Sequence, residues 1–266
     1  MFGKNAYCQC VFFYDIIIKK KKGNVLVMNT YGIQLYSLRD ISKDDLRGTL
    51  KKVADMGYKT VEFAGFFDNA AKDVKAWLNE YGLTAIGTHT GAPALENDFD
   101  ATVAYHKAIG CTDIIIPYAP HGTKAEIDGL VEKVNKWIPL LKKEGISLHY
   151  HNHATEFKPN SDGLIAIDEL AKRTEILLEI DTYWAFVAGK NPCDVLDELG
   201  DRVKLIHLKD GLENGEGLSL GLGKAPVSDV LKKSLATGRG IIVESEGLDP
   251  TGEEEVARCM EYLKKQ

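Results

Sequence analysis

Three of the seven histidines in this 266-residue chain lie in one ten-residue stretch, Leu148–Phe157 (LHYHNHATEF). In an extended segment His149, His151 and His153 would share one face, because strand side chains alternate with a period of two. Glu156 follows three residues later, where the strand should give way to a loop. Imidazoles and a carboxylate at a strand end are what a divalent metal or a proton-transfer site requires. Each histidine alone is explained by core hydrogen bonding, but the cluster with Glu156 indicates chemistry.

Three later strand-like segments carry further ionisable side chains: 176–181 (ILLEID), 203–209 (VKLIHLK) and 240–246 (GIIVESE). In each, apolar side chains alternate with polar ones, so the polar face should point away from the packed helices. Burying several charges together is costly unless they bind a metal or one another. A salt bridge to a lysine would explain one such carboxylate alone. Together with the first stretch they offer three carboxylates and one imidazole, from Glu156, Asp181, His207 and Glu244. That set suits one divalent ion, Mn²⁺, Mg²⁺, Co²⁺ or Zn²⁺, with Mn²⁺ favoured.

The elements that must position these groups repeat from residue 31 onward as a short apolar strand, a polar loop and an amphipathic helix. We expect strands near 31–36, 60–64, 84–88, 113–117, 146–151, 176–181, 203–209 and 240–246. We expect helices near 43–56, 70–81, 99–109, 124–144, 164–173, 192–199, 227–237 and 253–265. Ser42 is the expected cap of the first helix, and Pro139 should bend or split the fourth. Eight such units predict one (β/α)8 TIM barrel, with chemistry at the carboxyl ends of the strands. A doubly wound open sheet is the alternative, weakened because no Gly-x-Gly-x-x-Gly follows the first strand.

The composition is that of an ordinary globular domain, with 44% hydrophobic and 27% charged residues. The formal net charge of −6 argues against nucleic acid or an anionic membrane as a partner. The cysteines are odd in number and widely spaced, at Cys8, Cys10, Cys111, Cys193 and Cys259. That pattern is not a disulfide framework and favours a reducing, cytoplasmic location.

Residues 1–27 stand apart from this pattern. The apolar run Val11–Ile18 carries Asp15, and the basic run Lys19–Lys22 follows it, which is the reverse of a signal peptide. The run is also too short to span a bilayer. The segment before Met28 shows neither a capped helix nor a strand–turn pattern consistent with the later repeat. We therefore expect translation to start at Met28, leaving 28–266 as the catalytic barrel; a genuine N-terminal arm is the alternative.

Six motifs resemble the sugar isomerase/epimerase-like barrels of the xylose isomerase-like superfamily, in the subgroup with a YHNH strand. They are QLYSLRD (34–40), GYKTVEFAG (57–65), YHNHATEF (150–157), EIDTYW (179–184), IHLKD (206–210) and VESE (243–246). The resemblance covers the chain from about residue 31 to its end. It implies one divalent metal held by Glu156, Asp181, His207 and Glu244, with a sugar bound through vicinal oxygens. The implied chemistry is removal of the proton α to a carbonyl by a carboxylate or a histidine.

One position departs from the family. Many relatives have a histidine three residues after the aspartate of the fourth motif, where this chain has Trp184. A tryptophan can stack on a sugar but cannot transfer a proton, which adds weight to His151 and His153 as bases beside Glu156 and Glu244. The candidate substrate-binding residues are Glu62, His89, Trp184 and Lys209, each of which also has a packing or salt-bridge explanation.

Two weaker signals complete the candidate pocket. Tyr118, Tyr183 and Trp184 are candidates for an aromatic platform under a sugar, or equally for packing. The glycines of Ser219–Lys224 (SLGLGK) follow the seventh strand, where barrels bind phosphate through loop amides. Because no arginine or P-loop spacing accompanies them, we interpret this segment as an ordinary flexible loop.

The leading functional hypothesis is a metal-dependent sugar isomerase/epimerase, with Glu156 and Glu244 as paired acid and base. The alternative is a lyase that eliminates the aglycone of a 3-keto-glycoside, for which one base suffices, His153 by preference. A third hypothesis is a non-catalytic barrel subunit, disfavoured because all four metal residues are present. A nuclease ranks lower still, since it needs several metals and a basic groove. The sequence leaves open a monomer, a homo-oligomer or a partner subunit.

Overall fold

The computed structural model describes residues 17–21, 24–28 and 30–266, which divide into two units at Thr30. In the first unit β1 (Ile17–Lys21) and β2 (Asn24–Met28) pair as an antiparallel hairpin, with Ile17 opposite Met28. This antiparallel hairpin does not follow the strand–helix repeat of the later chain. Cys8 and Cys10 lie outside the described residues, and the start at Met28 stays a prediction.

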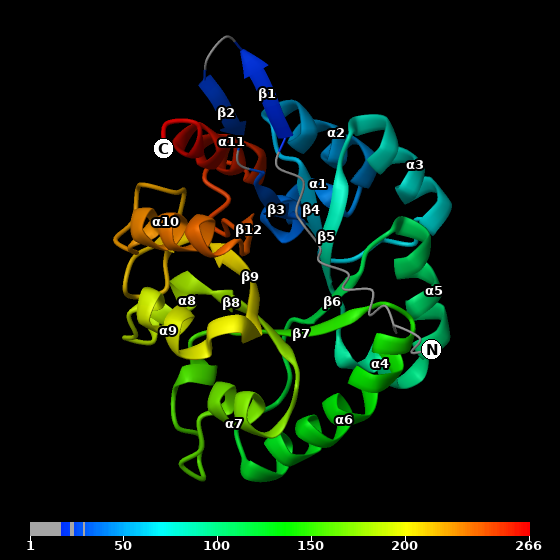
Figure 1. The fold of residues 1–266 in the computed structure, drawn as a ribbon, viewed down its shortest axis with the longest axis vertical. Helices are drawn as coiled ribbons and strands as arrows, with labels where there is room; N and C mark the ends of the chain where they lie inside the picture. The colour runs from blue at the N-terminus through cyan, green and yellow to red at the C-terminus, as the bar shows by residue number, and fades with distance from the viewer. Residues whose placement is uncertain (1–16, 22–23, 29) are drawn as a thin grey trace, which may run out of the picture. The chain divides into compact units, whose positions relative to one another are not determined.

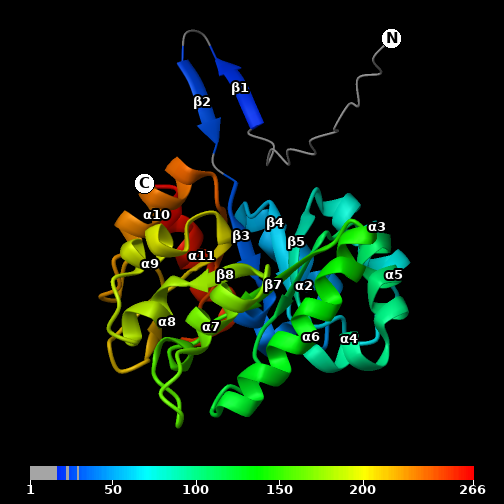
Figure 2. The same cartoon turned by 60° about the horizontal axis from the view of Figure 1, so that its bottom comes forward.

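The second unit is a closed barrel of eight parallel strands, as the repeat of strand and helix predicted. The strands are β3 (Gly32–Gln34), β4 (Thr60–Phe63), β5 (Thr84–His89), β6 (Asp113–Ile116), β7 (Ser147–His151), β8 (Leu177–Asp181), β9 (Val203–Leu208) and β12 (Gly240–Val243). They follow one another around the barrel in chain order, and β12 closes it by pairing with both β9 and β3. Figure 1 shows the strands surrounded by helices, and Figure 2 shows the same arrangement from a second direction.

Eight helices cover the outside of the barrel. They are α2 (Leu46–Met56), α3 (Ala71–Tyr81), α5 (Phe99–Ile109), α6 (Lys124–Lys143), α7 (Ala166–Arg173), α9 (Pro192–Leu199), α10 (Val227–Thr237) and α11 (Gly252–Leu263). α2 begins later than expected, because the carboxylate of Asp45 rather than Ser42 accepts from the backbone N–H of Gly48 at 2.8 Å. α6 runs through Pro139 as one helix. Gly57 ends α2 in the left-handed conformation, which a glycine adopts at little cost.

Shorter elements that were not expected follow several strands. They are η1 (Leu35–Leu38), α1 (Arg39–Ser42), α4 (Ala92–Asn97), η2 (Thr155–Phe157), α8 (Thr182–Val187), η3 (Gly200–Arg202) and the pair β10 (Asp210–Gly211) and β11 (Gly217–Leu218). η1 cuts the first barrel strand short at Gln34. α8 forms because the Asp181 carboxylate accepts from the N–H of Trp184 at 2.9 Å, which places Trp184 on a helix directly after β8.

Two apolar clusters hold the barrel together. The larger one packs the strands against the helices. The smaller one joins Ile86, Ile115, Leu205 and Ile242, which come from opposite sides of the barrel and therefore meet inside it. Because strand side chains repeat every two residues, the next inward position after Leu205 is His207, one layer closer to the carboxyl end. An apolar plug thus lies beneath a layer of ionisable groups.

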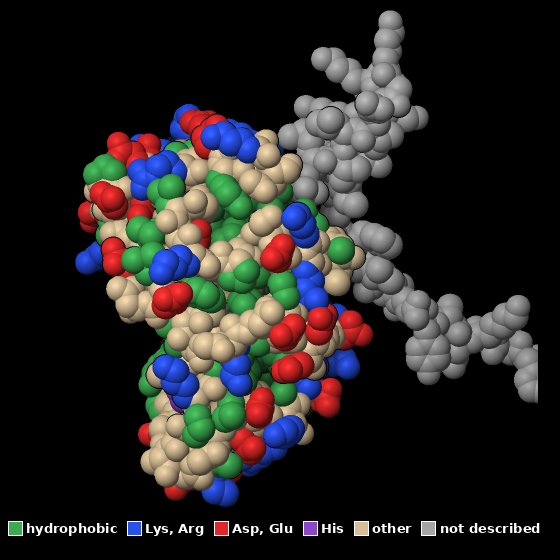
Figure 3. Space-filling model, turned by 90° about the vertical axis from the view of Figure 1, so that its left-hand side faces the viewer, with side chains coloured by type: hydrophobic (Ala, Val, Ile, Leu, Met, Phe, Trp, Pro, Cys, Tyr) green, Lys and Arg blue, Asp and Glu red, His purple; other side chains and the backbone are tan. Residues whose placement is uncertain are grey.

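Two features of the described residues bear on partners. No helix among them is both long and apolar enough to cross a membrane. On the face drawn in Figure 3, acidic and basic side chains are interspersed with apolar ones, without a continuous basic strip.

Candidate active site

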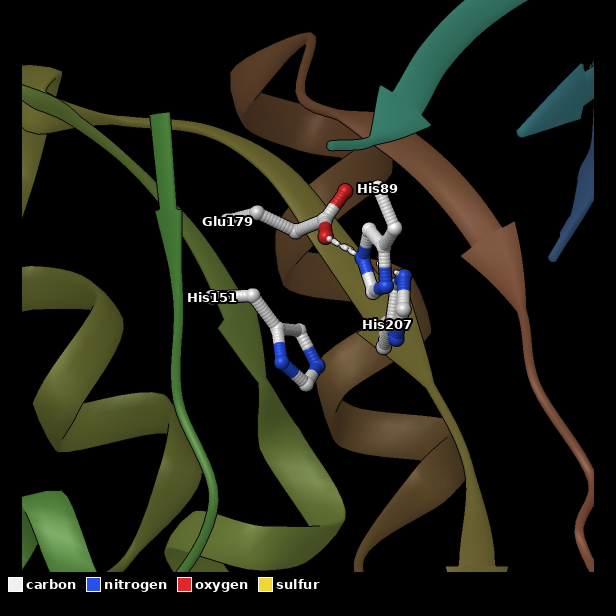
Figure 4. Close-up of side chains that lie close together, drawn as sticks. All are labelled: His89, His151, Glu179 and His207. Carbon is white, nitrogen blue, oxygen red and sulfur yellow. Dashed lines mark hydrogen bonds and ion pairs between the residues drawn. The ribbon is translucent and has the colours of Figure 1, made fainter. Parts of the chain in front are cut away.

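Imidazoles and carboxylates from neighbouring strands meet at the carboxyl ends of the barrel. His89 from β5, His151 from β7, Glu179 from β8 and His207 from β9 converge in Figure 4. The ring centroid of His207 lies 4.7 Å from that of His151 and 5.4 Å from that of His89. All are buried except His89, whose side chain is partly exposed.

Two overlapping groups of four have the spacing of metal ligands, with one nitrogen or oxygen of each residue within 4.8 Å of the others. The first group is His89, His151, Glu179 and His207. The second group is His151, Asp181, His207 and Glu244. The second group contains three of the four ligands expected from the sequence, and His151 stands where Glu156 was expected.

The second group contains polar atoms that need a partner. His151 Nε2 and Asp181 Oδ2 are buried, lie 3.8 Å apart and have no hydrogen-bond partner among the described residues. His207 Nδ1 lies 3.9 Å from Asp181 Oδ2 and 3.3 Å from Glu244 Oε2. Buried polar atoms are almost always paired, so orphaned atoms that converge indicate a missing ligand. Two imidazole nitrogens and two carboxylate oxygens fit a borderline divalent ion. We refer to this group as the candidate metal site.

The first group is already held together by hydrogen bonds deeper in the barrel. His89 Nε2 lies 2.9 Å from Glu179 Oε2, and His207 Nε2 lies 2.7 Å from Glu62 Oε2. The amide of Gln34 also donates to Glu62 Oε2 at 2.7 Å. These contacts occupy the inward nitrogen of His207, so its other nitrogen remains for the candidate metal site.

The deep carboxylates and imidazoles balance one another's charge. Burial raises the pKa of Glu179 to about 7, and the nearby Glu62 carboxylate adds to the rise. Burial also acts against ionisation of Glu62, but His89 and His207 outweigh it and hold the pKa of Glu62 at about 2. Burial opposes the charge of His89, yet Glu62 and Glu179 leave its pKa raised. Glu62 is fully buried, whereas His89 reaches a cavity wall.

Gly87 leaves room for the buried carboxylate of Glu62 beside it. A Cβ atom added to Gly87 would lie 2.8 Å from Glu62 Oε1 and 2.6 Å from Ile115 Cδ1. Both distances are shorter than real contacts of a Cβ atom, so any larger residue would displace the carboxylate or the apolar plug. Here a glycine is required by close approach rather than by its backbone angles.

Glu156 lies outside the candidate metal site. Its Oε2 accepts from the backbone N–H of His153 and from Thr155 Oγ1, both at 3.0 Å. Its Oε1 lies 3.4 Å from the hydroxyl of Tyr150 and 3.8 Å from His121 Nδ1. The carboxylate therefore braces the turn that carries His153. Its role as a ligand or as a base stays a prediction.

The three histidines of the first motif have separate positions. β7 ends at His151, so the expectation that all three share a strand face was wrong. His149 is buried against Asp113, with 2.8 Å between Nε2 and Oδ1. His153 lies past the strand end with 41% of its side chain exposed. His151 is the last residue of β7, as Asp181 is of β8, and this shared strand-end position is the signal that could have identified His151 as a candidate ligand.

A cavity of about 330 Å³ connects the candidate metal site with the surface. It is lined by Tyr36, Ala64, His89, Pro117, Tyr118, His151, His153, Glu244 and Glu246. Its walls thus include a metal-site carboxylate, three histidines and two tyrosines. We refer to it as the active-site cavity.

Lys209 is buried beside this cavity among acidic and aromatic groups. Its Nζ pairs with Glu246 and lies 3.4 Å from Glu244 Oε2. The same atom lies 4.7 Å from the ring centroid of Trp184. Burial opposes its charge, but Glu244 and Asp181 outweigh burial and raise the pKa of Lys209. Lys209 therefore stays charged and balances the acidic cluster, and Trp184 covers it.

The glycine-rich loop after β9 is tied down by one carboxylate. Asp210 Oδ1 accepts from the N–H groups of Gly211 at 2.8 Å and Ala225 at 3.1 Å. Its Oδ2 accepts from those of Gly221 at 2.9 Å and Gly223 at 3.0 Å. Two of these donors, Gly221 and Gly223, lie in the loop 219–224, so amides there that could bind phosphate are occupied by the chain's own anion.

Two curated enzymes are similar to this chain in sequence. An inosose dehydratase of Geobacillus kaustophilus (strain HTA426) is 25% identical over 186 residues, 60% of this chain and 60% of that enzyme. The chain thus spans less than two thirds of that relative. A 2-oxo-tetronate isomerase of Haemophilus influenzae is 25% identical over 193 residues, 62% of this chain and 75% of that enzyme.

A solved structure and a family description also match this chain. A sugar phosphate isomerase/epimerase from Parabacteroides distasonis ATCC 8503 superposes with a TM-score of 0.77 and 26% identity, covering 90% of this chain and 99% of that one. The family described as xylose isomerase-like TIM barrel matches residues 50–266. The protein belongs to the xylose isomerase-like TIM-barrel family.

Proposed function

We propose that this protein is a divalent-metal-dependent enzyme that removes the proton α to the carbonyl of a sugar-like substrate. The observation that carries the proposal is the pair of buried, unpartnered atoms His151 Nε2 and Asp181 Oδ2, which face each other 3.8 Å apart at the cavity. With His207 and Glu244 they would hold one ion, Mn²⁺ by preference. Bound there, the ion would supply Lewis-acid polarisation of the carbonyl oxygen.

His153 is the base in this proposal. It lies on the cavity wall, partly exposed, with its ring centroid 5.0 Å from that of the ligand His151. Glu156 accepts its backbone N–H, and the edge of the Tyr118 ring lies against it. An imidazole held in place and reachable by substrate suits proton abstraction near neutral pH.

Between the two outcomes weighed from the sequence, we favour β-elimination over epimerisation. Epimerisation needs a proton carrier on each face of the sugar. Among the bases weighed from the sequence, Glu156 holds the turn that carries His153, and Glu244 and His151 belong to the candidate metal site, which leaves His153. One base suffices for elimination. The likeness to inosose dehydratases, which are named for the removal of water, supports the same outcome.

Isomerisation between adjacent carbons is the second candidate. One base can also carry a proton from one carbon to the next, and the 2-oxo-tetronate isomerase matches over 75% of its length.

A small sugar-type substrate and a reducing, cytoplasmic setting accompany either proposal. The three described cysteines are free, in keeping with such a setting.

The test begins with metal content. The purified protein should bind one divalent ion per chain, and a chain that binds none after reconstitution would overturn the proposal. The loaded enzyme is then given p-nitrophenyl 3-keto-β-D-glucoside or a simple ketose. Release of p-nitrophenol supports elimination, and isomerisation of the ketose supports the second candidate. If the loaded enzyme carries out neither reaction, both candidates are contradicted.

The base is tested in the same assay. His153→Asn should lower turnover by about 10²- to 10⁴-fold while metal content stays at the wild-type level. His106→Gln, a histidine replacement outside the cavity lining, is the matched control and should keep its activity. Equal turnover of His153→Asn and wild type would remove His153 as the base.

A further inference from the structure

One strip of residues on α11 and the turn that follows it faces away from the barrel. Its members recur at intervals of three and four residues or are direct neighbours of such positions, so they share one face of the helix. They are Glu254, Ala257, Arg258, Glu261, Tyr262 and Lys265, all exposed or half-buried. We refer to these six residues as the α11 strip.

The charges of the α11 strip alternate in sign along the chain. Read from either end, each acidic residue corresponds to a basic one, so Glu254 corresponds to Lys265 and Arg258 to Glu261. Two identical strips that lie antiparallel would therefore bring opposite charges together throughout. The same reversal places the small Ala257 of one strip opposite the large Tyr262 of the other. A surface that complements itself in this way is what a twofold interface between identical chains requires.

Ion pairs within the helix do not account for both ends of the strip. Spacing of four residues would allow Glu254 to pair with Arg258, and Glu261 with the lysine at the end of the strip. Glu261 instead forms its ion pair with Lys264, at 2.7 Å. Among the residues that the structure describes, neither Glu254 nor Lys265 has an ion-pair partner within 4.0 Å. The helix dipole favours an acid in the first turn and a base in the last, but it does not set the order of the charges between them.

Two side chains of the strip are held in place before any partner arrives. Arg258 Nε donates to Ser219 Oγ at 3.1 Å, and its Nη2 donates to the Asp249 carbonyl. A guanidinium has five N–H donors, so others remain for a carboxylate. A Cβ atom added to Gly221 would lie 2.6 Å from Cδ2 of Tyr262, so the loop backbone lies directly against that ring. Groups that are ordered before association lose little entropy on binding.

Apolar surface lies beside the charged residues. Leu222 is 64% exposed, more than any other large hydrophobic residue that the structure describes. A cavity of about 420 Å³ next to it is lined by residues 219–222 and by every strip residue except Glu254. A projecting side chain and a hollow on the same surface suit two identical chains, because each chain can fill the hollow of the other. Burial of this surface would add a hydrophobic contribution to the contact.

We propose that two copies of this chain associate through the α11 strip as an antiparallel, twofold-symmetric pair. A second copy fits this surface better than an acidic or a basic partner, because the strip has two charges of each sign and either partner would be repelled by half of it. None of the strip residues lines the active-site cavity, so this interface is separate from the proposed metal site and reaction.

Association of the full chain is measured by sedimentation-velocity ultracentrifugation over a range of concentrations. One helix face and its flanking loop form a small contact, typical of weak and transient association, so the range extends to about 10⁻⁴ M. We expect a monomer–dimer equilibrium that shifts towards the monomer when salt is added, because exposed charge pairs are screened. A monomer at every concentration would overturn the proposal.

Charge reversal identifies the surface. Glu254→Lys or Lys265→Glu alone brings like charges together twice in each dimer, so each variant should raise the dissociation constant at least about tenfold. Both changes in one chain should restore association. An equimolar mixture of the two single variants should also associate, because one chain then has lysine at both positions and the other has glutamate at both.

Lys143→Glu is the matched control, since it makes the same charge change at an exposed position in the last turn of another outer helix, α6. Its dissociation constant should equal that of the wild type. Thermal melting verifies the fold of each variant. Rescue by the second change separates a lost contact from simple destabilisation. Single reversals that leave association unchanged would assign the dimer to another face and overturn the proposal.

A carbodiimide, which joins a lysine directly to a carboxylate in contact with it, tests the antiparallel arrangement. Glu254 and Lys265 lie eleven residues apart on α11 and its final turn, roughly 16 Å along the helix axis. A direct link between them must therefore join two chains, and a mixture of ¹⁵N-labelled and unlabelled protein should give links that contain both labels. Links from Glu254 or Glu261 to lysines in residues 1–29 would instead assign this face to the chain's own N-terminal segment and contradict the proposal.

Discussion

His207 Nε2 and Glu62 Oε2 lie 2.7 Å apart, and both side chains are fully buried. The contact directs the other ring nitrogen of His207 towards Asp181 and Glu244. A carboxylate behind a metal-binding imidazole fixes the orientation of the ring and raises its basicity. Glu62 thus has the position of a residue that supports the site from behind, although the sequence suggested substrate binding.

Glu62→Gln should weaken metal binding by about 10- to 100-fold, the usual cost of losing such a partner. The affinity is measured by competition with a chelator. Asp113→Asn is a matched control, because it alters a carboxylate–histidine pair, that with His149, outside the candidate metal site. If both variants lose metal equally, the effect is general destabilisation and the role of Glu62 is refuted.

His151→Ala and Glu156→Gln distinguish the ligand set of the structure from the one expected from the sequence. His151→Ala should lower metal affinity by more than about 100-fold, because it removes a proposed nitrogen ligand itself. Loss of a residue that only supports a ligand costs less than this. Glu156→Gln should retain the metal, since an amide oxygen can still accept the N–H of His153. Metal content after dialysis against a weak chelator is the measurement. Loss of metal in Glu156→Gln alone would restore the original assignment.

Asp210→Asn should destabilise the protein by about 1–3 kcal/mol, because one carboxylate oxygen becomes an NH₂ group that faces backbone donors. Each oxygen of Asp210 accepts two N–H groups, so neither orientation of the amide avoids the conflict. Thermal melting should show a fall of about 2–4 °C for each kcal/mol. Metal content should stay unchanged, and an unaltered melting temperature would show that the loop does not depend on this anion.

His106 should make the fold sensitive to mild acid. Burial is the main cause that lowers the pKa of His106, while its hydrogen bond to the Thr102 carbonyl acts in the opposite direction. The folded protein therefore binds this proton less readily than the unfolded chain. The stabilising effect is complete above the unfolded pKa of about 6.5 and is lost as the pH falls from there towards the folded pKa.

Urea unfolding at pH 7.5 and pH 5 tests this effect in wild type and His106→Gln at the same metal concentration. The variant cannot gain the proton, so it should lose less stability between the two pH values. Contributions of the other histidines are common to both proteins and cancel in the difference. Parallel losses in the two proteins would exclude His106 as the source.

The barrel and much of the candidate metal site were predictable because they depend on periodic signals. Glycines such as Gly57 marked helix ends, and alternation within strands directed Asp181 and His207 to one face. The orientation of Glu156 relative to the cluster could not be predicted, because Glu156 lies beyond a strand end, where no period applies. Its direction depends on contacts with Tyr150 and Thr155 that only the folded chain creates.

The close approach of the Gly87 backbone to Glu62 restricts how the sequence of this protein can evolve. As long as a lineage keeps the carboxylate at position 62, selection forbids a side chain at position 87, even though the two positions lie on different strands. Once Glu62 is lost, the part of the restriction that comes from the carboxylate is removed, while Ile115 Cδ1 still lies 2.6 Å from the position of a Cβ atom. Alignments of relatives should therefore show the two sites changing as a linked pair, so glycine at the second position becomes a marker of lineages that keep the buried glutamate.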